Sequence, residues 1–173
     1  MTQSDIKKIV ENLIQTFLDA GKISLDLRKK GLTKEIKSDN TPVSNGDLEI
    51  NKILIKKILS LTPNIPIVSE ETSENKLKNN LENFWLIDPI DGTYDYINDL
   101  DEFTINAGLI IKKKPVAGLI YAPAKNRMFY SYGDDFSFEL INGEPIKLDN
   151  SKNFDKNEIK FVSYSNKIKP EIN

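Results

Sequence analysis

The sequence contains neither cysteine nor histidine among its 173 residues. Without cysteine the chain has no disulfides and no thiolate chemistry. Without histidine it has no imidazole general base, no Ser-His-Asp triad and no His-ligated zinc site. Any catalysis must therefore use carboxylates, hydroxyls, lysines or bound metals, and hard oxygen ligands favour Mg²⁺ or a similar ion.

An excess of positive charge and long apolar runs are missing as well. The 24 Lys and Arg residues are balanced by 26 Asp and Glu residues, so no basic excess favours a nucleic acid polymer. No apolar run has the length of a membrane span, and the first residues lack the apolar core of a signal peptide. We therefore expect a cytoplasmic protein, and a small anionic metabolite remains compatible with the charge if metals neutralise it locally.

The amino-terminal part of the chain predicts a long helix. Apolar residues recur at spacings of three and four from Ile6 to Leu18, which is the pattern of a helix with one buried face. Ser4 or Asp5 can cap its start, and the pattern extends towards Gly31. The overall composition, with 39% apolar and 29% charged residues, is that of a globular chain long enough to bury a core.

A second helix is predicted over residues 45–61. Ser44 and Asp47 have the spacing of a capping box, and the Thr-Pro-Asn sequence at 62–64 ends the helix. Residues 34–43, between the two helices, are polar and predict a loop or hairpin. The expected buried stripe of the second helix consists of Leu48, Ile50, Ile53, Leu54 and Ile58.

The periodicity then changes to that of β-structure. Strands are predicted at 65–68, 84–87, 103–111, 116–121, 128–132, 136–141 and 160–164. A short helix is expected over 92–98, and Asn142-Gly143 predicts a hairpin turn. Two helices followed mainly by strands indicate an α+β fold, with the helices packed on a largely antiparallel sheet.

Acidic residues gather where these predicted elements begin or end. They are Asp47 at the start of the second helix, Glu70 and Glu71 after one strand, and Asp88 and Asp91 after another. Because ligand crevices often form where such ends meet, the acidic residues can converge on one site. The most informative stretch is 85–93, which reads Trp-Leu-Ile-Asp-Pro-Ile-Asp-Gly-Thr.

Each part of this stretch has a physical use. The apolar strand holds Asp88 at its tip, and Pro89 fixes the turn that follows. Asp88 and Asp91 can present carboxylates to two neighbouring cations, and the Ile90 carbonyl can act as a neutral ligand. Gly92 lets a phosphate approach the backbone, where the start of a helix offers N–H groups.

Stretch 85–93 resembles the signature of the inositol monophosphatase superfamily, whose members are Mg²⁺-dependent, lithium-sensitive phosphatases. Segments 37–47 and 68–71 resemble the upstream loop and the glutamate strand of that superfamily. Segments 103–106 and 115–123 resemble its bisphosphate nucleotidase branch, which includes CysQ-type enzymes. These enzymes remove the 3′-phosphate from 3′-phosphoadenosine 5′-phosphate (PAP). The resemblance covers nearly the whole chain.

The resemblance implies a metal site and a catalytic group. The implied metal ligands, for two or three Mg²⁺ ions in a complete enzyme, are Glu70, Asp88, Asp91 and the Ile90 carbonyl. Thr93, hydrogen-bonded to Asp47, would orient or deprotonate a metal-activated water for in-line attack, and Glu70 belongs to the same catalytic group. The residues implied to contact the substrate are Glu70, Ile90, Asp91, Gly92 and Thr93.

Two features depart from the family pattern. Tyr94-Asp95-Tyr96 stands where nucleotidase members often have Lys-Glu-Phe. The single tryptophan is Trp85, so the Trp-Asp motif that supplies a further aspartate in the longer family members is absent. We therefore expect residues 1–155 to form the amino-terminal half of the layered sugar-phosphatase fold, and 156–173 to begin a truncated second α/β domain. An uncovered apolar sheet face would favour self-association.

The expected function is Mg²⁺-dependent hydrolysis of a small phosphorylated metabolite, with PAP giving AMP and phosphate. The alternatives are an inositol monophosphatase-like activity and a non-catalytic, truncated fragment that binds metal. Single residues also have simpler interpretations. The aspartates of 88–91 could form a turn and a helix cap, and Asp47 and Thr93 could each merely cap a helix. We expect Lys37 to be solvated and Glu71 to be solvated or to lie behind the ligands.

Overall fold

The computed structural model describes residues 1–37, 41–72 and 80–148. Its helices are α1 (Gln3–Lys30), α2 (Asn45–Leu61), α3 (Thr93–Ile97) and the 3₁₀ turn η1 (Pro123–Lys125). Its strands are β1 (Lys34–Ile36), β2 (Pro42–Ser44), β3 (Ile67–Ser69), β4 (Phe84–Asp91), β5 (Thr104–Ile111), β6 (Lys114–Ala122), β7 (Arg127–Ser131), β8 (Ser137–Ile141) and β9 (Glu144–Lys147).

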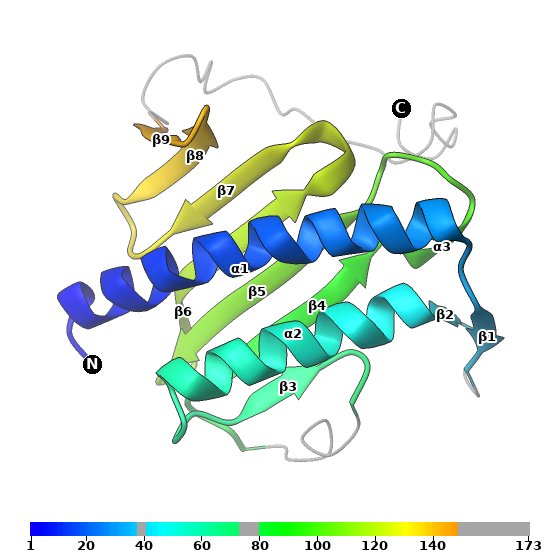
Figure 1. The fold of residues 1–173 in the computed structure, drawn as a ribbon. Helices are drawn as coiled ribbons and strands as arrows, with labels where there is room; N and C mark the ends of the chain where they lie inside the picture. The colour runs from blue at the N-terminus through cyan, green and yellow to red at the C-terminus, as the bar shows by residue number, and fades with distance from the viewer. Residues whose placement is uncertain (38–40, 73–79, 149–173) are drawn as a thin grey trace, which may run out of the picture.

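The described residues form two layers, with α1 and α2 covering one face of a seven-stranded sheet (Figure 1). The strands follow one another in chain order from β3 to β9, and β3–β4 is the parallel pair among antiparallel neighbours. Strands β1 and β2 form a separate antiparallel hairpin. The predicted α+β fold, with two helices on a largely antiparallel sheet, is therefore confirmed.

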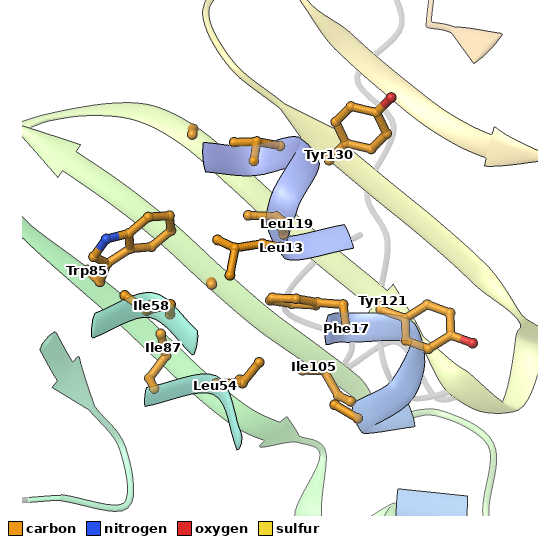
Figure 2. Packing of buried hydrophobic residues seen from close by; sticks show 14 of the residues in the cluster. Leu13, Phe17, Leu54, Ile58, Trp85, Ile87, Ile105, Leu119, Tyr121 and Tyr130 are labelled. Atoms are coloured by element: carbon orange, nitrogen blue, oxygen red, sulfur yellow. The ribbon is translucent and has the colours of Figure 1, made fainter. Parts of the chain in front are cut away.

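The core lies between the helix layer and the sheet. Phe17 of α1 and Leu54 of α2 are fully buried, and they face Trp85, Ile105 and other inward-pointing strand residues (Figure 2). Alternate residues along each strand point to the opposite face. In the described part of the chain that face retains large exposed apolar side chains, because Leu86 is 51% exposed and Ile120 is 49% exposed.

Helix α1 begins with a different cap from the one predicted. Thr2, rather than Ser4 or Asp5, is the N-cap. The Thr2 hydroxyl accepts from the Asp5 amide at 3.2 Å, and the Asp5 carboxylate accepts from the Thr2 amide at 2.8 Å. This reciprocal pair explains the earlier start, since it satisfies two N–H groups at the beginning of the helix. The helix ends as predicted before Gly31, whose φ of 94° closes the last turn.

Helix α2 has the predicted bounds and the predicted capping box. Its buried side includes Ile50, Leu54 and Ile58, which are four residues apart. The expectation that Leu48 is buried is wrong, because its side chain is 42% exposed. Two residues correspond to a rotation of about 200° around a helix, so Leu48 points away from the face that carries Ile50.

The predicted strands are present with shifted ends where the structure describes them. Strand β4 continues past the predicted end to Asp91, and β9 was not predicted. The predicted turn at Asn142-Gly143 joins β8 to β9, with positive φ at both residues. The predicted strand at 160–164 and the predicted domain boundary at 155 lie outside the described residues.

Candidate metal centre

Parallel pairing of β3 with β4 brings the glutamate segment to the aspartate segment. Ser69 pairs with Ile87, and the Glu70 amide donates to the Ile87 carbonyl at 3.1 Å. Parallel strands end at the same edge of a sheet. Glu70, the first residue after β3, therefore lies beside Asp88, which follows the apolar residues of β4. The expected convergence of these two acidic positions is therefore present.

A β-bulge sets the direction of the second aspartate. Asp88 pairs with Asn106 on β5, and Asp91 pairs with Thr104, so three steps along β4 correspond to two along β5. The extra residue bends the strand and re-aims the side chains around it. Both aspartates consequently line the same pocket instead of pointing to opposite faces of the sheet.

Gly92 closes this corner in a conformation that favours glycine. Its φ is 90°, and a Cβ atom built there would lie 2.6 Å from the Glu102 carbonyl oxygen. Helix α3 then begins at Thr93, whose hydroxyl lies 2.9 Å from Asp47 Oδ1 and 3.0 Å from the Ile90 carbonyl oxygen. A hydroxyl has one proton, so Thr93 donates to one of these oxygens at a time.

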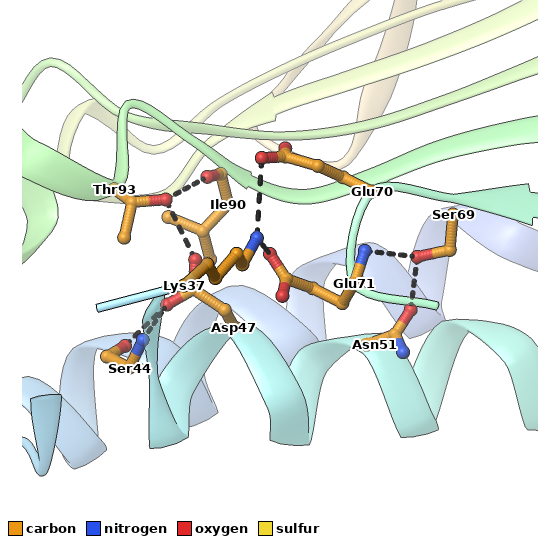
Figure 3. A network of polar contacts seen from close by, with 9 residues as sticks. All are labelled: Lys37, Ser44, Asp47, Asn51, Ser69, Glu70, Glu71, Ile90 and Thr93. Carbon is orange, nitrogen blue, oxygen red and sulfur yellow. Dashed lines mark hydrogen bonds and ion pairs between the residues drawn. The ribbon is translucent and has the colours of Figure 1, made fainter. Parts of the chain in front are cut away.

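Asp47 connects this corner to helix α2. Its side chain is fully buried, and Oδ2 accepts from the amide of Ser44 at 2.8 Å and from the Ser44 hydroxyl. Oδ1 accepts from Thr93 (Figure 3). The capping interpretation of Asp47 and the interpretation as the partner of Thr93 are therefore both correct, because the two oxygens serve different donors.

The predicted site residues other than Asp47 share one open pocket of about 450 Å³. The residues that line it are Thr41, Pro42, Glu70, Asp88, Ile90, Asp91, Gly92, Thr93, Tyr94 and Asp95. Asp47 does not line the pocket and reaches it through Thr93. Tyr94, at one of the positions that depart from the family pattern, is 67% exposed at the pocket, whereas Tyr96 is buried and donates to the Ser24 carbonyl at 2.7 Å.

The electrostatics of the pocket favour a bound cation. Burial, followed by the charge of Glu70, a side-chain hydrogen bond with Glu70 and the charge of Asp91, raises the pKa of Asp88 to about 7. Within the described residues, Asp88 Oδ1 is a buried acceptor without a hydrogen-bond partner. A hard cation would satisfy this oxygen and relieve the repulsion between the carboxylates, so the donor set fits Mg²⁺.

The carboxylates line one pocket without surrounding a single point. Within residues 1–37, 41–72 and 80–148, no three acidic side chains stand close enough together to form a complete ligand set. Lys37 Nζ lies 3.6 Å from Glu70 Oε1 and 2.8 Å from Glu71 Oε1 (Figure 3). Part of the negative charge at the glutamate segment is thus paired with a lysine.

The expectation of a solvated Lys37 is wrong. Its side chain is 23% exposed, and that of its partner Glu71 is 3% exposed. The pairing brings the β1–β2 hairpin onto the end of β3, a contact between segments 34 residues apart. The Glu71 side chain is buried and does not line the pocket, so the expectation that it is solvated is wrong as well. Sequence spacing alone carried no signal that these charges would meet.

Sequence reasoning also missed two polar neighbours of the site. Asn106 donates to Asp91 Oδ2 at 3.2 Å, and its own Oδ1 is buried without a partner among the described residues. Asn51 accepts from the Ser69 hydroxyl at 2.7 Å. Two signals were available in the sequence. Asn106 is a polar residue within the apolar strand 103–111, and Asn51 stands four positions after Asp47.

The described residues form an α+β fold in which the ends of β3 and β4 bring carboxylates together beside Gly92. This arrangement defines a candidate site for metal-assisted binding of phosphate. The inositol monophosphatase family model matches residues 5–172, and the chain belongs to that family. The predicted family is therefore confirmed. None of the described helices combines the length and the apolar character that crossing a membrane requires.

Curated relatives carry the name 3′(2′),5′-bisphosphate nucleotidase CysQ. The Haemophilus influenzae protein is 36% identical over 140 residues, which cover 79% of this chain and 52% of that protein. The Aggregatibacter actinomycetemcomitans protein is 32% identical over 142 residues, covering 81% of this chain and 53% of that protein. The chain thus spans about half the length of the curated relatives it matches.

Solved structures share the fold at lower identity. The extragenic suppressor protein suhB from Bartonella henselae matches with a TM-score of 0.68 and 22% identity, over 76% of this chain and 52% of that protein. An IMPase/NADP phosphatase complexed with Mg²⁺ and phosphate matches with a TM-score of 0.66 and 20% identity, over 78% of this chain and 51% of that one. At this identity the likeness supports the fold.

Proposed function

We propose that this chain carries the metal- and phosphate-binding half of a Mg²⁺-dependent phosphatase that hydrolyses PAP to AMP and phosphate. The observation that carries the proposal is the buried Oδ1 of Asp88, which has no hydrogen-bond partner among the described residues and lies in one pocket with Glu70 and Asp91. The bisphosphate nucleotidase names of the curated relatives support the substrate. The family membership supports phosphate-ester hydrolysis.

The proposed metal ligands are Glu70, Asp88, Asp91 and the Ile90 carbonyl. A bound Mg²⁺ supplies Lewis-acid stabilisation of phosphate oxygens and lowers the pKa of a water molecule. Glu70 directly follows β3, and the other three residues of this set lie on β4 at the bulge between Asp88 and Asp91. For the complete protein we infer two or three ions, inhibition by lithium and a cytoplasmic location, on the basis of the family and the composition.

Thr93 and Asp47 are proposed to handle the attacking water, with Glu70 beside them. Thr93 has two acceptors for its single proton, Asp47 Oδ1 and the Ile90 carbonyl. If the Ile90 carbonyl binds a cation, the hydroxyl donates to Asp47 and its lone pairs are free to accept from water. Asp47 therefore fixes Thr93 as an acceptor, and the buried Ser44 pair holds Asp47 in place.

The substrate is proposed to meet the same segment. Glu70, Ile90 and Asp91 would contact it through the metals, and the backbone amides of Gly92 and Thr93 would bind its phosphate. Gly92 and Thr93 both line the pocket, which supports this contact. Residues 1–155 are proposed as the amino-terminal domain. Its uncovered sheet face favours self-association when no further domain packs on it.

Two further candidates have specific support. The solved structures that share the fold include inositol monophosphatases, which favours inositol 1-phosphate as the alternative substrate. The match to about half of each relative favours a fragment that binds metal without turning over substrate. We expect little or no phosphate release from these 173 residues alone.

The test is a Mg²⁺-dependent phosphate-release assay on PAP and on inositol 1-phosphate, run with the complete protein that the gene encodes. We expect PAP to be the better substrate and release to stop when Mg²⁺ is chelated. Preference for inositol 1-phosphate would transfer the assignment to the first alternative. Release that persists without divalent metal would contradict the proposal.

A further inference from the structure

We propose that Asn51 is a positioning residue, which through Ser69 fixes the corner that carries Glu70. Helix α2 then determines where this proposed metal ligand stands relative to Asp88. The inference rests on the proposed metal-binding function. It assigns a role to a residue that does not line the pocket.

The contacts form a short chain from helix to strand tip. The Ser69 hydroxyl donates to Asn51 Oδ1 at 2.7 Å and accepts from the Glu71 amide at 3.2 Å (Figure 3). Ser69 is fully buried and Asn51 is 5% exposed, so water does not readily substitute for either partner. With its proton directed to Asn51, the hydroxyl presents a lone pair to Glu71 and is held in one orientation.

The same helix also holds the aspartate corner. Asp47 lies one helical turn before Asn51, and both side chains are buried. Asp47 binds Thr93 at 2.9 Å, whereas Asn51 binds Ser69 at 2.7 Å. Two polar anchors, about 6 Å apart along one rigid helix, therefore hold the two segments that bring the proposed ligands together.

The corner is held from both sides. The Glu70 amide donates to the Ile87 carbonyl of β4, and the next amide, that of Glu71, donates to Ser69. If Asn51 is truncated, Ser69 loses the acceptor that orients its hydroxyl, and the Glu71 amide loses a fixed acceptor. The Glu70 side chain then samples more orientations. Because residues behind metal ligands act by such orientation, metal affinity should fall about 10- to 100-fold.

The experiment titrates this chain with Mn²⁺ by calorimetry. Asn51→Ala and Ser69→Ala are each expected to raise the Mn²⁺ Kd about 10- to 100-fold. The matched control is Thr62→Val, at the other end of α2. Thr62 is also buried and accepts from Trp85 Nε1 at 3.0 Å, so this variant loses a comparable buried hydrogen bond between α2 and β4. It should lose similar thermal stability with unchanged Mn²⁺ affinity.

The double variant Asn51→Ala/Ser69→Ala adds a second criterion. Because the two residues act in series, it should bind Mn²⁺ no more weakly than the poorer single variant. Circular dichroism identifies the variants that fold. If one single variant does not fold, the Mn²⁺ affinity of the other tests the prediction. Unchanged affinity in the folded variants, or an equal loss in Thr62→Val, would overturn the positioning role. Unchanged affinity in Asp88→Asn would instead overturn the proposed function.

Discussion

The Asp47 carboxylate accepts hydrogen bonds from both Ser44 and Thr93. Substitutions at Asp47 and at Ser44 should distinguish the capping role of Asp47 from its role at Thr93. In Asp47→Asn one oxygen becomes an NH₂ group, which cannot accept from Ser44 or from Thr93. We expect a loss of about 2 kcal/mol in the free energy of unfolding, measured in urea. Ser44→Ala removes the cap, should cost about 1 kcal/mol and leaves the Thr93 contact in place.

Phosphate release then distinguishes the two roles. In the complete protein, Asp47→Asn should lower kcat by about 10²–10⁴-fold, because the proposed acceptor state of Thr93 is no longer fixed. Ser44→Ala should retain most of the activity. Equal activities in the two variants would show that Asp47 acts as a helix cap alone.

Asp88 predicts how stability depends on pH in the absence of metal. Its pKa is raised from 3.8 to about 7, mainly by burial. A carboxyl group whose pKa is higher in the folded state stabilises that state while protonated, so the contribution is lost as the pH rises through about 7. The metal-free protein should therefore lose stability from about pH 4 to pH 8 in urea unfolding. Asp88→Asn should flatten this fall, and an identical slope in both proteins would contradict the assignment.

At the scale of elements, Gly92 determines how β4 turns into α3. Gly92→Ala places a Cβ 2.6 Å from the Glu102 carbonyl at a φ of 90°. Gly143→Ala is the matched control, since φ is 84° there but nothing lies within 4 Å of the added atom. The control should cost about 1 kcal/mol from backbone strain, whereas Gly92→Ala should cost clearly more in urea unfolding and also weaken Mn²⁺ binding. Equal costs would show that the close approach to Glu102 is not limiting.

Local signals predicted much of this architecture. The capping box at Ser44 and the apolar spacing after it were sufficient to define α2, because both act within one helical turn. The stretch 85–93 supplies five of the residues that line the pocket, namely Asp88, Ile90, Asp91, Gly92 and Thr93. The Lys37–Glu71 pair and the Asn51–Ser69 contact were not predictable, since each depends on how separate elements pack.

The strands show the same difference between local signals and contacts made by packing. Strand β9 lacks a buried face, and its four residues are all exposed, so no alternation of apolar residues marked it. Its existence depends on pairing with β8 through the turn at Asn142-Gly143. That turn itself was predictable, because both of its residues tolerate positive φ.

At the scale of the whole molecule, the sheet face opposite the helices should control self-association. Leu86 and Ile120 on this face are each about half exposed. The double variant Leu86→Lys/Ile120→Lys should shift sedimentation towards the monomer, because exposed apolar faces associate and charged side chains oppose this. Leu59→Lys, at a 43% exposed position on α2, is the control and should leave sedimentation unchanged. A wild-type chain that is monomeric at high concentration would contradict this prediction.

The central claim is that Asp88 organises a metal site, and calorimetric titration with Mg²⁺ tests it most directly. The wild-type chain should bind one ion better than a second, since Glu70, Asp88 and the Ile90 carbonyl can each offer an oxygen to the first while the second has fewer carboxylates. Binding should release protons below about pH 7, because Asp88 must ionise. Asp88→Asn should abolish the better site, and binding that is unchanged in this variant would contradict the claim.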